Sequence, residues 1–327
     1  MTAIFLHSGW RTGSTYFWSR FRHNPRTLAY YEPLHEVLAT PGAGLTGFSG
    51  NPAASHHPAL EAPYFAEYQP LIDDGRIGQF DPAFSYRRFF LSATDEDPGL
   101  RRYLLMLIGH AESCGRVPVL GFSRSLGRVG WLKHTFEAVH LLVFRDPRRQ
   151  WASMVHQRDR YRVPYFLINQ FLICGQNRDH PLLRPLIGRY DLPLIRTSCV
   201  ANDIALYQRV FEGVGDNIGY LVFYYLWRLT QDLARPHCEF ILDAGRLAAD
   251  PACRAETAES LRARTGLALS FEDAAGKHPE VGQPALDYPR IEAFVEDLIS
   301  GLVPPEPPPE PPPGPPPEPP PGPPLGS

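Results

Sequence analysis

The first 21 residues carry the feature that most constrains the fold: a short apolar run, a loop rich in glycine and hydroxyl groups, and then a helical pattern. The apolar run covers residues 3–6, and the loop contains Gly9 and Gly13. Glycine lets the backbone turn tightly, and Ser14 and Thr15 stand where the first N–H groups of the following helix have no intrahelical acceptor. A buried strand that leads through such a loop into a helix indicates an anion-binding site, as in phosphate-binding α/β proteins.

This loop differs from the one that binds nucleoside triphosphates. That pattern is G-x-x-x-x-G-K-[ST], whereas here the two glycines are one residue too close and Ser14 stands where the lysine would be. The 32 basic residues include only two lysines, Lys133 and Lys277. Arg11 is therefore the only cation that the loop offers to an anion.

Composition excludes several classes of protein. A net charge of -3 argues against a general nucleic-acid binder, and the 43% hydrophobic content supports a large core. The five cysteines have no metal-ligand spacing, which predicts buried, reduced thiols and no metal site. With no signal-peptide pattern and no apolar stretch near 20 residues, we expect a cytoplasmic protein that does not interact with membranes.

Strand-like and helix-like segments alternate along the first half of the chain, which predicts an α/β fold with a central parallel sheet flanked by helices. The expected strands are residues 3–6, 28–31, 117–122, 139–144 and 239–242. The expected helices are the segment after the loop to about residue 23, then 98–113, 129–136, 151–158, 200–212, 218–233 and 251–265. Residues 41–70, rich in glycine and proline, are expected to run over the surface.

The composition changes abruptly near residue 303. Residues 304–327 are mostly proline with scattered glutamate and glycine, which predicts a disordered tail of polyproline II conformation after a folded domain of residues 1–303. Such a tail serves as a spacer or an inert end, or it binds a partner that recognises polyproline.

A second candidate anion site follows the apolar run at 139–144. That strand delivers Arg145 to its carboxyl end, Pro147 forces a turn, and the next helix carries Ser153 back toward the same region. Ligands of open parallel sheets bind outside the carboxyl ends of the strands. We therefore expect Arg145 and Ser153 to hold one phosphate together.

Taken together, these motifs resemble those of sulfotransferases that use 3′-phosphoadenosine 5′-phosphosulfate (PAPS). The segment Arg11-Thr-Gly-Ser-Thr15 is similar to the family's 5′-phosphosulfate loop, and Arg145 with Ser153 is similar to its 3′-phosphate motif. Tyr30-Tyr-Glu-Pro-Leu34 resembles the acidic segment of carbohydrate and protein-tyrosine sulfotransferases. The resemblance implies a P-loop NTPase-like sulfotransferase fold and PAPS as co-substrate. The chain departs from the small-molecule branch, because Arg11 replaces the usual lysine and no R-K-G segment occurs late in the sequence.

The resemblance also implies site residues. Those expected to bind PAPS are Arg11, Thr12, Gly13, Ser14, Thr15, Tyr16, Arg145 and Ser153. Arg11 would stabilise the departing phosphate electrostatically, because arginine keeps its proton near neutral pH. For Tyr16, stacking on adenine and packing in the core are both open.

The acceptor hydroxyl needs a base, and Glu32 and His35 are the candidates. For Glu32 the alternative is an ion pair with Arg11 or Arg124, and Glu36 is expected to be a solvated charge. Arg124 and Arg128 follow a predicted strand and are interpreted either as contacts to the nucleotide or an anionic acceptor, or as surface charges.

Two other functions remain as hypotheses. A P-loop kinase or NTPase would need Asp146 as its magnesium ligand, and a non-catalytic binding module would use the proline-rich tail to recruit a partner. The acceptor and the oligomeric state do not follow from the sequence, since acceptor sites are built from variable loops, here residues 35–95 and 155–215.

Overall fold

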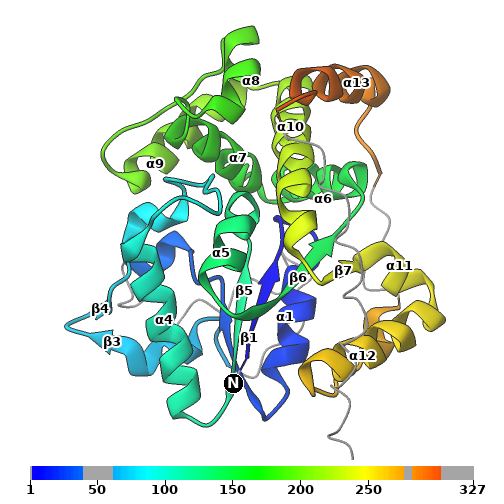
Figure 1. Cartoon of the computed structure of the whole chain (residues 1–327). Helices are drawn as coiled ribbons and strands as arrows, with labels where there is room; N and C mark the ends of the chain where they lie inside the picture. The colour runs from blue at the N-terminus through cyan, green and yellow to red at the C-terminus, as the bar shows by residue number, and fades with distance from the viewer. Residues whose placement is uncertain (1, 40–61, 276–281, 303–327) are drawn as a thin grey trace, which may run out of the picture.

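A five-stranded parallel sheet forms the centre of the molecule (Figure 1). The computed structural model describes residues 2–39, 62–275 and 282–302. The strands are β1 (Ala3–His7), β2 (Thr27–Tyr31), β5 (Val117–Phe122), β6 (Ala138–Phe144) and β7 (Phe240–Asp243). Their order is β2-β5-β1-β6-β7, and every neighbouring pair is parallel. The expected α/β class with a central parallel sheet is confirmed.

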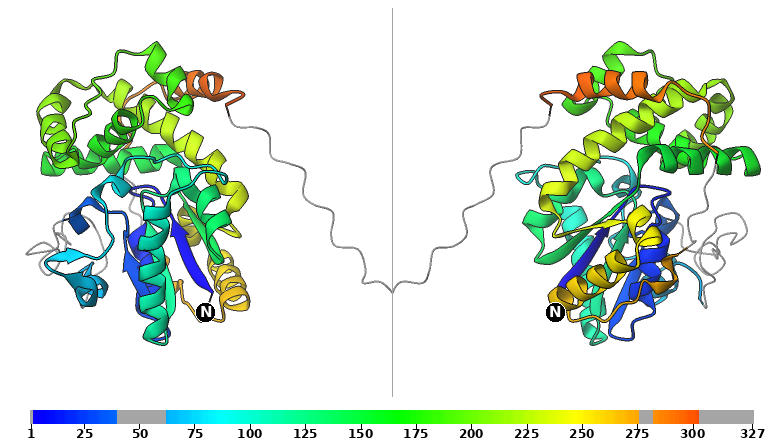
Figure 2. Two further views of the ribbon diagram at one scale, coloured as in Figure 1. Left: turned by 60° about the vertical axis from the view of Figure 1, so that its left-hand side comes forward. Right: turned by 90° about the vertical axis from the view of Figure 1, so that its right-hand side faces the viewer.

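Helices cover both faces of this sheet, which explains why β1 and β6 are apolar without alternation. The helices α4 (Pro98–Ser113) and α5 (Val129–Thr135) lie on one face, and α1 (Ser14–Arg22) and α12 (Pro251–Thr265) lie on the other (Figures 1 and 2). The short α11 (Ala244–Ala249) leads from β7 into α12. A small antiparallel hairpin pairs β3 (Ile72–Asp73) with β4 (Arg76–Ile77).

A second layer, made only of helices, lies beyond the carboxyl ends of the strands (Figure 1). It contains α6 (Pro147–Tyr161), α7 (Tyr165–Gln176), α8 (Arg184–Arg189), α9 (Val200–Val210), α10 (Asp216–Ala234) and α13 (Tyr288–Ile299). The layer has its own hydrophobic core, separate from the core around the sheet. The carboxyl edge of the sheet therefore faces a packed helical layer.

The strand order places a topological switch at β1. From β1 the chain runs to β2 on one side of the sheet, and from β6 it runs to β7 on the other side. Because β1 and β6 are neighbours, the loops that follow them run to opposite sides of the sheet, and open α/β sheets bind their ligands in the crevice expected at such a switch point. The loop after β1 and Arg145 after β6 both reach this crevice.

Several boundaries differ from the sequence expectation. The helix expected at 151–158 is α6, which begins at Pro147 because Asp146 caps it by accepting from the Arg149 N–H at 2.9 Å. The end of the supposed surface segment, residues 62–70, is not a surface excursion, since Tyr64, Phe65 and Tyr68 are buried against β2. Residues 41–61 and 304–327 lie outside the described residues.

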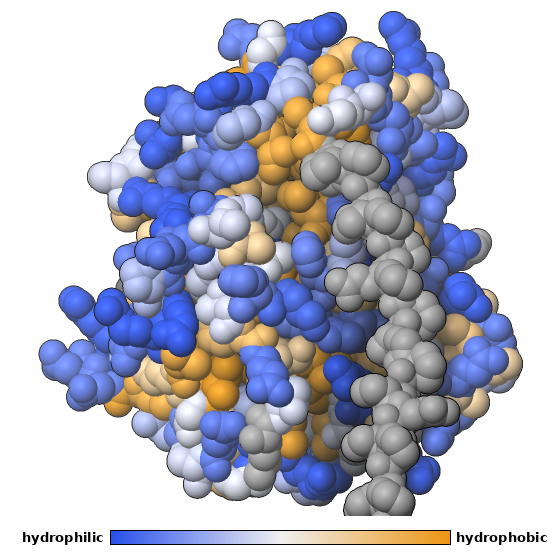
Figure 3. All heavy atoms as spheres, viewed as in Figure 1, coloured by the Kyte–Doolittle hydropathy of each residue, from blue (hydrophilic) through white to orange (hydrophobic). Residues whose placement is uncertain are grey.

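The surface is mixed in hydropathy, with hydrophobic residues grouped in places (Figure 3). All five cysteines are free, but Cys114 and Cys199 are exposed, which corrects the expectation of buried thiols. Among the residues that the structure describes, no helix is long and apolar enough to cross a membrane.

Candidate functional site

The loop after β1 is held in place by hydrogen bonds to β5 and from α6. Ser8 donates to the Phe122 carbonyl at 2.6 Å, and the Gln150 side chain donates to the Trp10 carbonyl at 2.7 Å. A β-carbon on Gly9 would lie only 3.1 Å from Gln150 Nε2, so α6 approaches the loop closely. Gly13 then adopts φ 96°, a left-handed conformation that favours glycine, immediately before α1. The loop is thus a preorganised turn at a helix N-terminus.

Arg11 joins the two motifs that the sequence analysis expected to lie together. Its Nε donates to Ser153 Oγ at 3.0 Å, and its carbonyl accepts from Arg145 Nη1 at 2.8 Å. Arg11 itself has φ 65°, an uncommon conformation for a residue with a side chain. Ser153 and Arg145 thus both contact Arg11, although they lie 142 and 134 positions after it in the sequence.

The two arginines make this point strongly electropositive. Burial lowers the pKa of Arg11, and burial together with the charges of Arg11 and Arg149 lowers the pKa of Arg145 to about 10. Among the described residues, Arg145 forms no ion pair with a carboxylate. Two guanidinium groups held together against their mutual repulsion would be stabilised by a bound anion.

Of the hydroxyl groups of Thr12, Ser14 and Thr15, two are already hydrogen-bonded within the protein. Thr12 Oγ1 donates to the Gly9 carbonyl at 2.8 Å, and the hydroxyls of Thr15 and Tyr31 are 3.1 Å apart. Ser14 is half-buried, and its side chain has no hydrogen bond within the described part of the chain. At Thr12 and Thr15, an anion would meet the backbone N–H groups rather than a free hydroxyl.

Tyr16 packs where the core and the surface meet. Its ring is 7% exposed, its hydroxyl donates to Asp273 at 2.8 Å, and the Arg20 guanidinium lies 4.9 Å from its ring centre. Of the two interpretations of Tyr16, this arrangement supports packing, because both the ring and the hydroxyl are already engaged within the protein.

Glu32 lies directly after β2 and faces Arg124. Its Oε2 accepts from the Ser123 hydroxyl at 2.6 Å and from Arg124 Nη1. In the described residues, no hydrogen bond reaches its Oε1. Glu32 also has φ 39°, again in the left-handed region. The expected ion pair with Arg124 is present, and it leaves one carboxylate oxygen able to accept a proton.

Glu36 is not the solvated charge that the sequence suggested. Its carboxylate accepts from Arg124 Nη2 at 2.8 Å and from the hydroxyls of Tyr86 and Tyr165, each at 3.1 Å. Burial raises the pKa of Glu36, but Arg124 and His35 outweigh it and bring the pKa to about 2. The interpretation was wrong because α7 and the 84–90 segment, both distant in sequence, cover this residue.

His35 lies beside the same cluster. Its Nε2 is 3.3 Å from the Tyr165 hydroxyl, and its Nδ1 accepts from the Val37 N–H at 3.1 Å. Burial lowers the pKa of His35, with Glu36 opposing the shift. Burial thus favours the neutral imidazole, which is the form that a base requires.

Arg124 and Arg128 are fully buried, so neither is a surface charge. Arg124 is 1% exposed and lies between Glu32 and Glu36, with its guanidinium 5.3 Å from the centre of the Trp10 ring. Arg128 donates to the carbonyls of residues 84, 87 and 88. Both side chains hold the protein together, which the loop-like sequence around them did not indicate.

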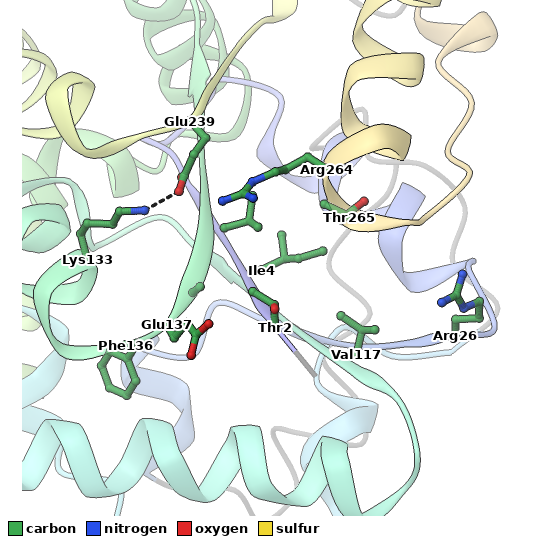
Figure 4. Close-up of a pocket in the computed structure, with 12 residues that line it drawn as sticks. Thr2, Ile4, Arg26, Val117, Lys133, Phe136, Glu137, Glu239, Arg264 and Thr265 are labelled. Atoms are coloured by element: carbon green, nitrogen blue, oxygen red, sulfur yellow. Dashed lines mark hydrogen bonds and ion pairs between the residues drawn. The ribbon is translucent and has the colours of Figure 1, made fainter. Parts of the chain in front are cut away.

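A hollow of about 610 Å³ lies at the opposite edge of the sheet (Figure 4). It is lined by the amino ends of the strands and by the end of α12: Thr2, Ile4, Arg26, Val117, Lys133, Phe136, Glu137, Ala138, Val139, Glu239, Arg264 and Thr265. One of its cations, Lys133, is paired with Glu239. None of these residues belongs to the crevice, so the hollow is separate from the candidate site.

Within the described residues, no group of three or more His, Cys, Asp or Glu side chains is placed to hold a metal ion. Comparisons with protein-family models, curated proteins and solved structures gave no match to this chain.

Proposed function

We propose that this protein is a PAPS-dependent sulfotransferase with a P-loop NTPase-like fold, which transfers a sulfuryl group to a hydroxyl acceptor such as a carbohydrate, a peptide or a small metabolite. The observation that carries the proposal is the contact of Arg11 with Arg145 and Ser153 at the switch point. The carboxylate of Glu32 follows β2 at the same edge of the sheet. The two arginines and Ser153 suit an anionic nucleotide, and Glu32 suits an acceptor hydroxyl that must lose its proton.

In this proposal the backbone N–H groups at the start of α1 and the Arg11 guanidinium bind the 5′-phosphosulfate, while Arg145 and Ser153 bind the 3′-phosphate. The acceptor oxygen forms a bond to sulfur as the bond from sulfur to the 5′-phosphate oxygen breaks. That oxygen keeps the electron pair, and Arg11 stabilises its charge. Glu32 or His35 takes the proton of the acceptor hydroxyl, which leaves a sulfate ester and 3′-phosphoadenosine 5′-phosphate (PAP).

Asp146 has a role that differs from the one a kinase would need. Its carboxylate accepts from the Arg149 N–H and caps α6. A kinase or NTPase would bind ATP with Mg²⁺, so this ligand is compared with PAP below.

Thermal unfolding with added nucleotides tests the proposal. PAP at 100 times its Kd is expected to stabilise the protein by about 2.7 kcal/mol, which raises the Tm by several degrees, whereas ATP with Mg²⁺ gives a much smaller shift. Arg145→Ala should weaken PAP binding at least tenfold through the loss of charge-assisted hydrogen bonds. Arg101→Ala, on the exposed side of α4, is the matched control. Tight binding of ATP with Mg²⁺ without binding of PAP would refute the proposal.

A further inference from the structure

Two carboxylates, Glu32 and Glu36, lie where the acceptor hydroxyl is proposed to bind. Glu32 and Glu36 share the guanidinium of Arg124, and in the described part of the chain the other basic side chain paired with either carboxylate is His35, whose Nδ1 lies 3.4 Å from Glu36 Oε2. Burial raises the pKa of Glu36, but Arg124 and His35 outweigh it and bring the pKa to about 2, while burial lowers the pKa of His35. Two carboxylates therefore face one guanidinium and one imidazole whose pKa burial lowers, so the cluster favours a neutral or cationic group over an anion beside it.

This charge is held rigidly. Arg124 Nη2 donates to the Tyr165 hydroxyl at 3.0 Å and lies 3.3 Å from Asn169 Oδ1, both on α7. Arg124 is 1% exposed and cannot swing out to meet a substrate. An anionic group brought to this side would face two carboxylates, with the Arg124 guanidinium already paired to both.

The neighbouring loop and helix supply aromatic rings. Phe166, at the start of α7, lies with its ring centre 5.5 Å from the Arg11 guanidinium, and Tyr165 precedes it. Trp10, the loop residue before Arg11, is 6% exposed and stacks on Arg124, and its indole N–H has no acceptor among the described residues. Aromatic faces attract cations and pack against apolar surfaces, and the indole N–H is a neutral donor for a hydroxyl oxygen.

The corner between α6 and α7 continues this surface outward. Val163, between the two helices, is 47% exposed, and Tyr161 and Pro164 on either side of it are half-buried. An acceptor that reaches Glu32 beside this corner would meet apolar and aromatic side chains next to the two carboxylates.

We infer that the acceptor is an alcohol or phenol that carries no negative charge, either neutral or amine-bearing, and that the Glu32–Arg124–Glu36 cluster rejects acidic acceptors. The inference rests on the proposed sulfotransferase function and specifies its substrate class. Acidic polymers and acidic peptides are thereby excluded as acceptors, because like charges placed side by side repel.

Charge-matched acceptors test the inference. One set is methyl glucoside, methyl glucosaminide and methyl glucuronide, and another is N-acetyltyrosinamide, tyramine and 4-hydroxyphenylacetate. Transfer of labelled sulfate from PAPS is measured for each. Within a set, kcat/KM for the acid is expected to be at least tenfold below that of the neutral compound. Comparable transfer to the acids, or failure to sulfate any neutral or cationic member, overturns the inference.

Glu36→Gln tests whether the cluster is the cause. The amide keeps the shape of the side chain and removes its charge, so the discrimination against the acids should fall several-fold. Glu67→Gln is the matched control, because Glu67 forms a similar partly buried ion pair with Arg22 away from the crevice. An unchanged discrimination in folded Glu36→Gln protein argues against the cluster. If that variant does not fold, the wild-type panel still decides.

PAP binding in the same preparations separates the two levels of proposal. If the protein does not bind PAP, both the sulfotransferase proposal and the inference about its acceptor are refuted. If the protein binds PAP but prefers acidic acceptors, only the inference about the acceptor is refuted.

Discussion

The carboxylate of Glu32 is oriented through one oxygen and leaves the other without a described hydrogen bond. Its Oε2 is engaged by Ser123 and Arg124, which orients the side chain, while no described hydrogen bond occupies Oε1. Its left-handed backbone turns the chain immediately after β2, at the point where Tyr31 contacts the loop helix through Thr15. An orienting cation on one oxygen and an available second oxygen suit a base that must be positioned before it accepts a proton.

We predict that Glu32→Gln lowers turnover by about 10² to 10⁴ and leaves PAP affinity nearly unchanged, because a positioned base contributes about that factor. Single-turnover sulfate transfer and PAP calorimetry measure the two quantities. His35→Gln is the comparison, since His35 touches the same cluster through Tyr165. Full activity of Glu32→Gln with inactive His35→Gln would assign the base role to His35.

At the scale of elements, the connection between β5 and α5 controls how the helical layer approaches the sheet. The short 3₁₀ turn Leu126–Arg128 lies under residues 84–90, and Arg128 binds three carbonyls of that segment. A β-carbon on Gly127 would come within 2.5 Å of the Phe89 carbonyl and 2.9 Å of its ring. The absence of a side chain at Gly127 allows the segment that supplies Tyr86 to lie beside the cluster.

Gly127→Ala is therefore expected to destabilise the protein by about 1–3 kcal/mol, as overpacking a core does. Denaturant unfolding measures the change. Gly109→Ala, in α4 with nothing within 4 Å of the added carbon, is the control and should stabilise the protein by up to about 1 kcal/mol. Equal effects of the two substitutions would contradict the close approach at Gly127.

At the scale of the whole molecule, two buried histidines link neighbouring strands of the sheet. His7 on β1 lies 2.9 Å from His140 on β6, and its other nitrogen lies 2.8 Å from the Ser125 hydroxyl. Burial lowers the pKa of His7, and burial together with the charge of Lys133 lowers that of His140 to about 4. Both are neutral in the folded protein, and protonation would place a charge inside the sheet.

Stability should consequently fall as the pH is lowered below 6.5. The unfolded chain, with a histidine pKa of about 6.5, binds the proton first, so acid favours unfolding. His140 alone accounts for a loss of about 2 kcal/mol by pH 5. Urea unfolding between pH 7 and pH 5 measures this slope, which His140→Gln should flatten and His156→Gln, exposed on α6, should preserve. A free energy of unfolding that is constant over this range would contradict the buried neutral pair.

Much of the fold follows from local pattern. The limits of α4 and α12 agree with the sequence expectation because both have clear boundary signals. Asp97 and Asp250 cap helices that begin with proline, and Gly266 ends α12 in a left-handed conformation. The helix α7 lacked such a signal, because it is buried on nearly all sides and shows little amphipathic periodicity.

By itself the sequence determined the parallel sheet, the loop with Arg11, and the return of Arg145 and Ser153 to the same edge, because these depend on strand and helix periods and on the rule that parallel strands end together. Only the tertiary structure decided that Arg124 is buried between Glu32 and Glu36, that α7 encloses Glu36, and that His7 meets His140. Burial and ion pairing depend on which distant elements pack against a residue, and a local pattern carries no record of those neighbours.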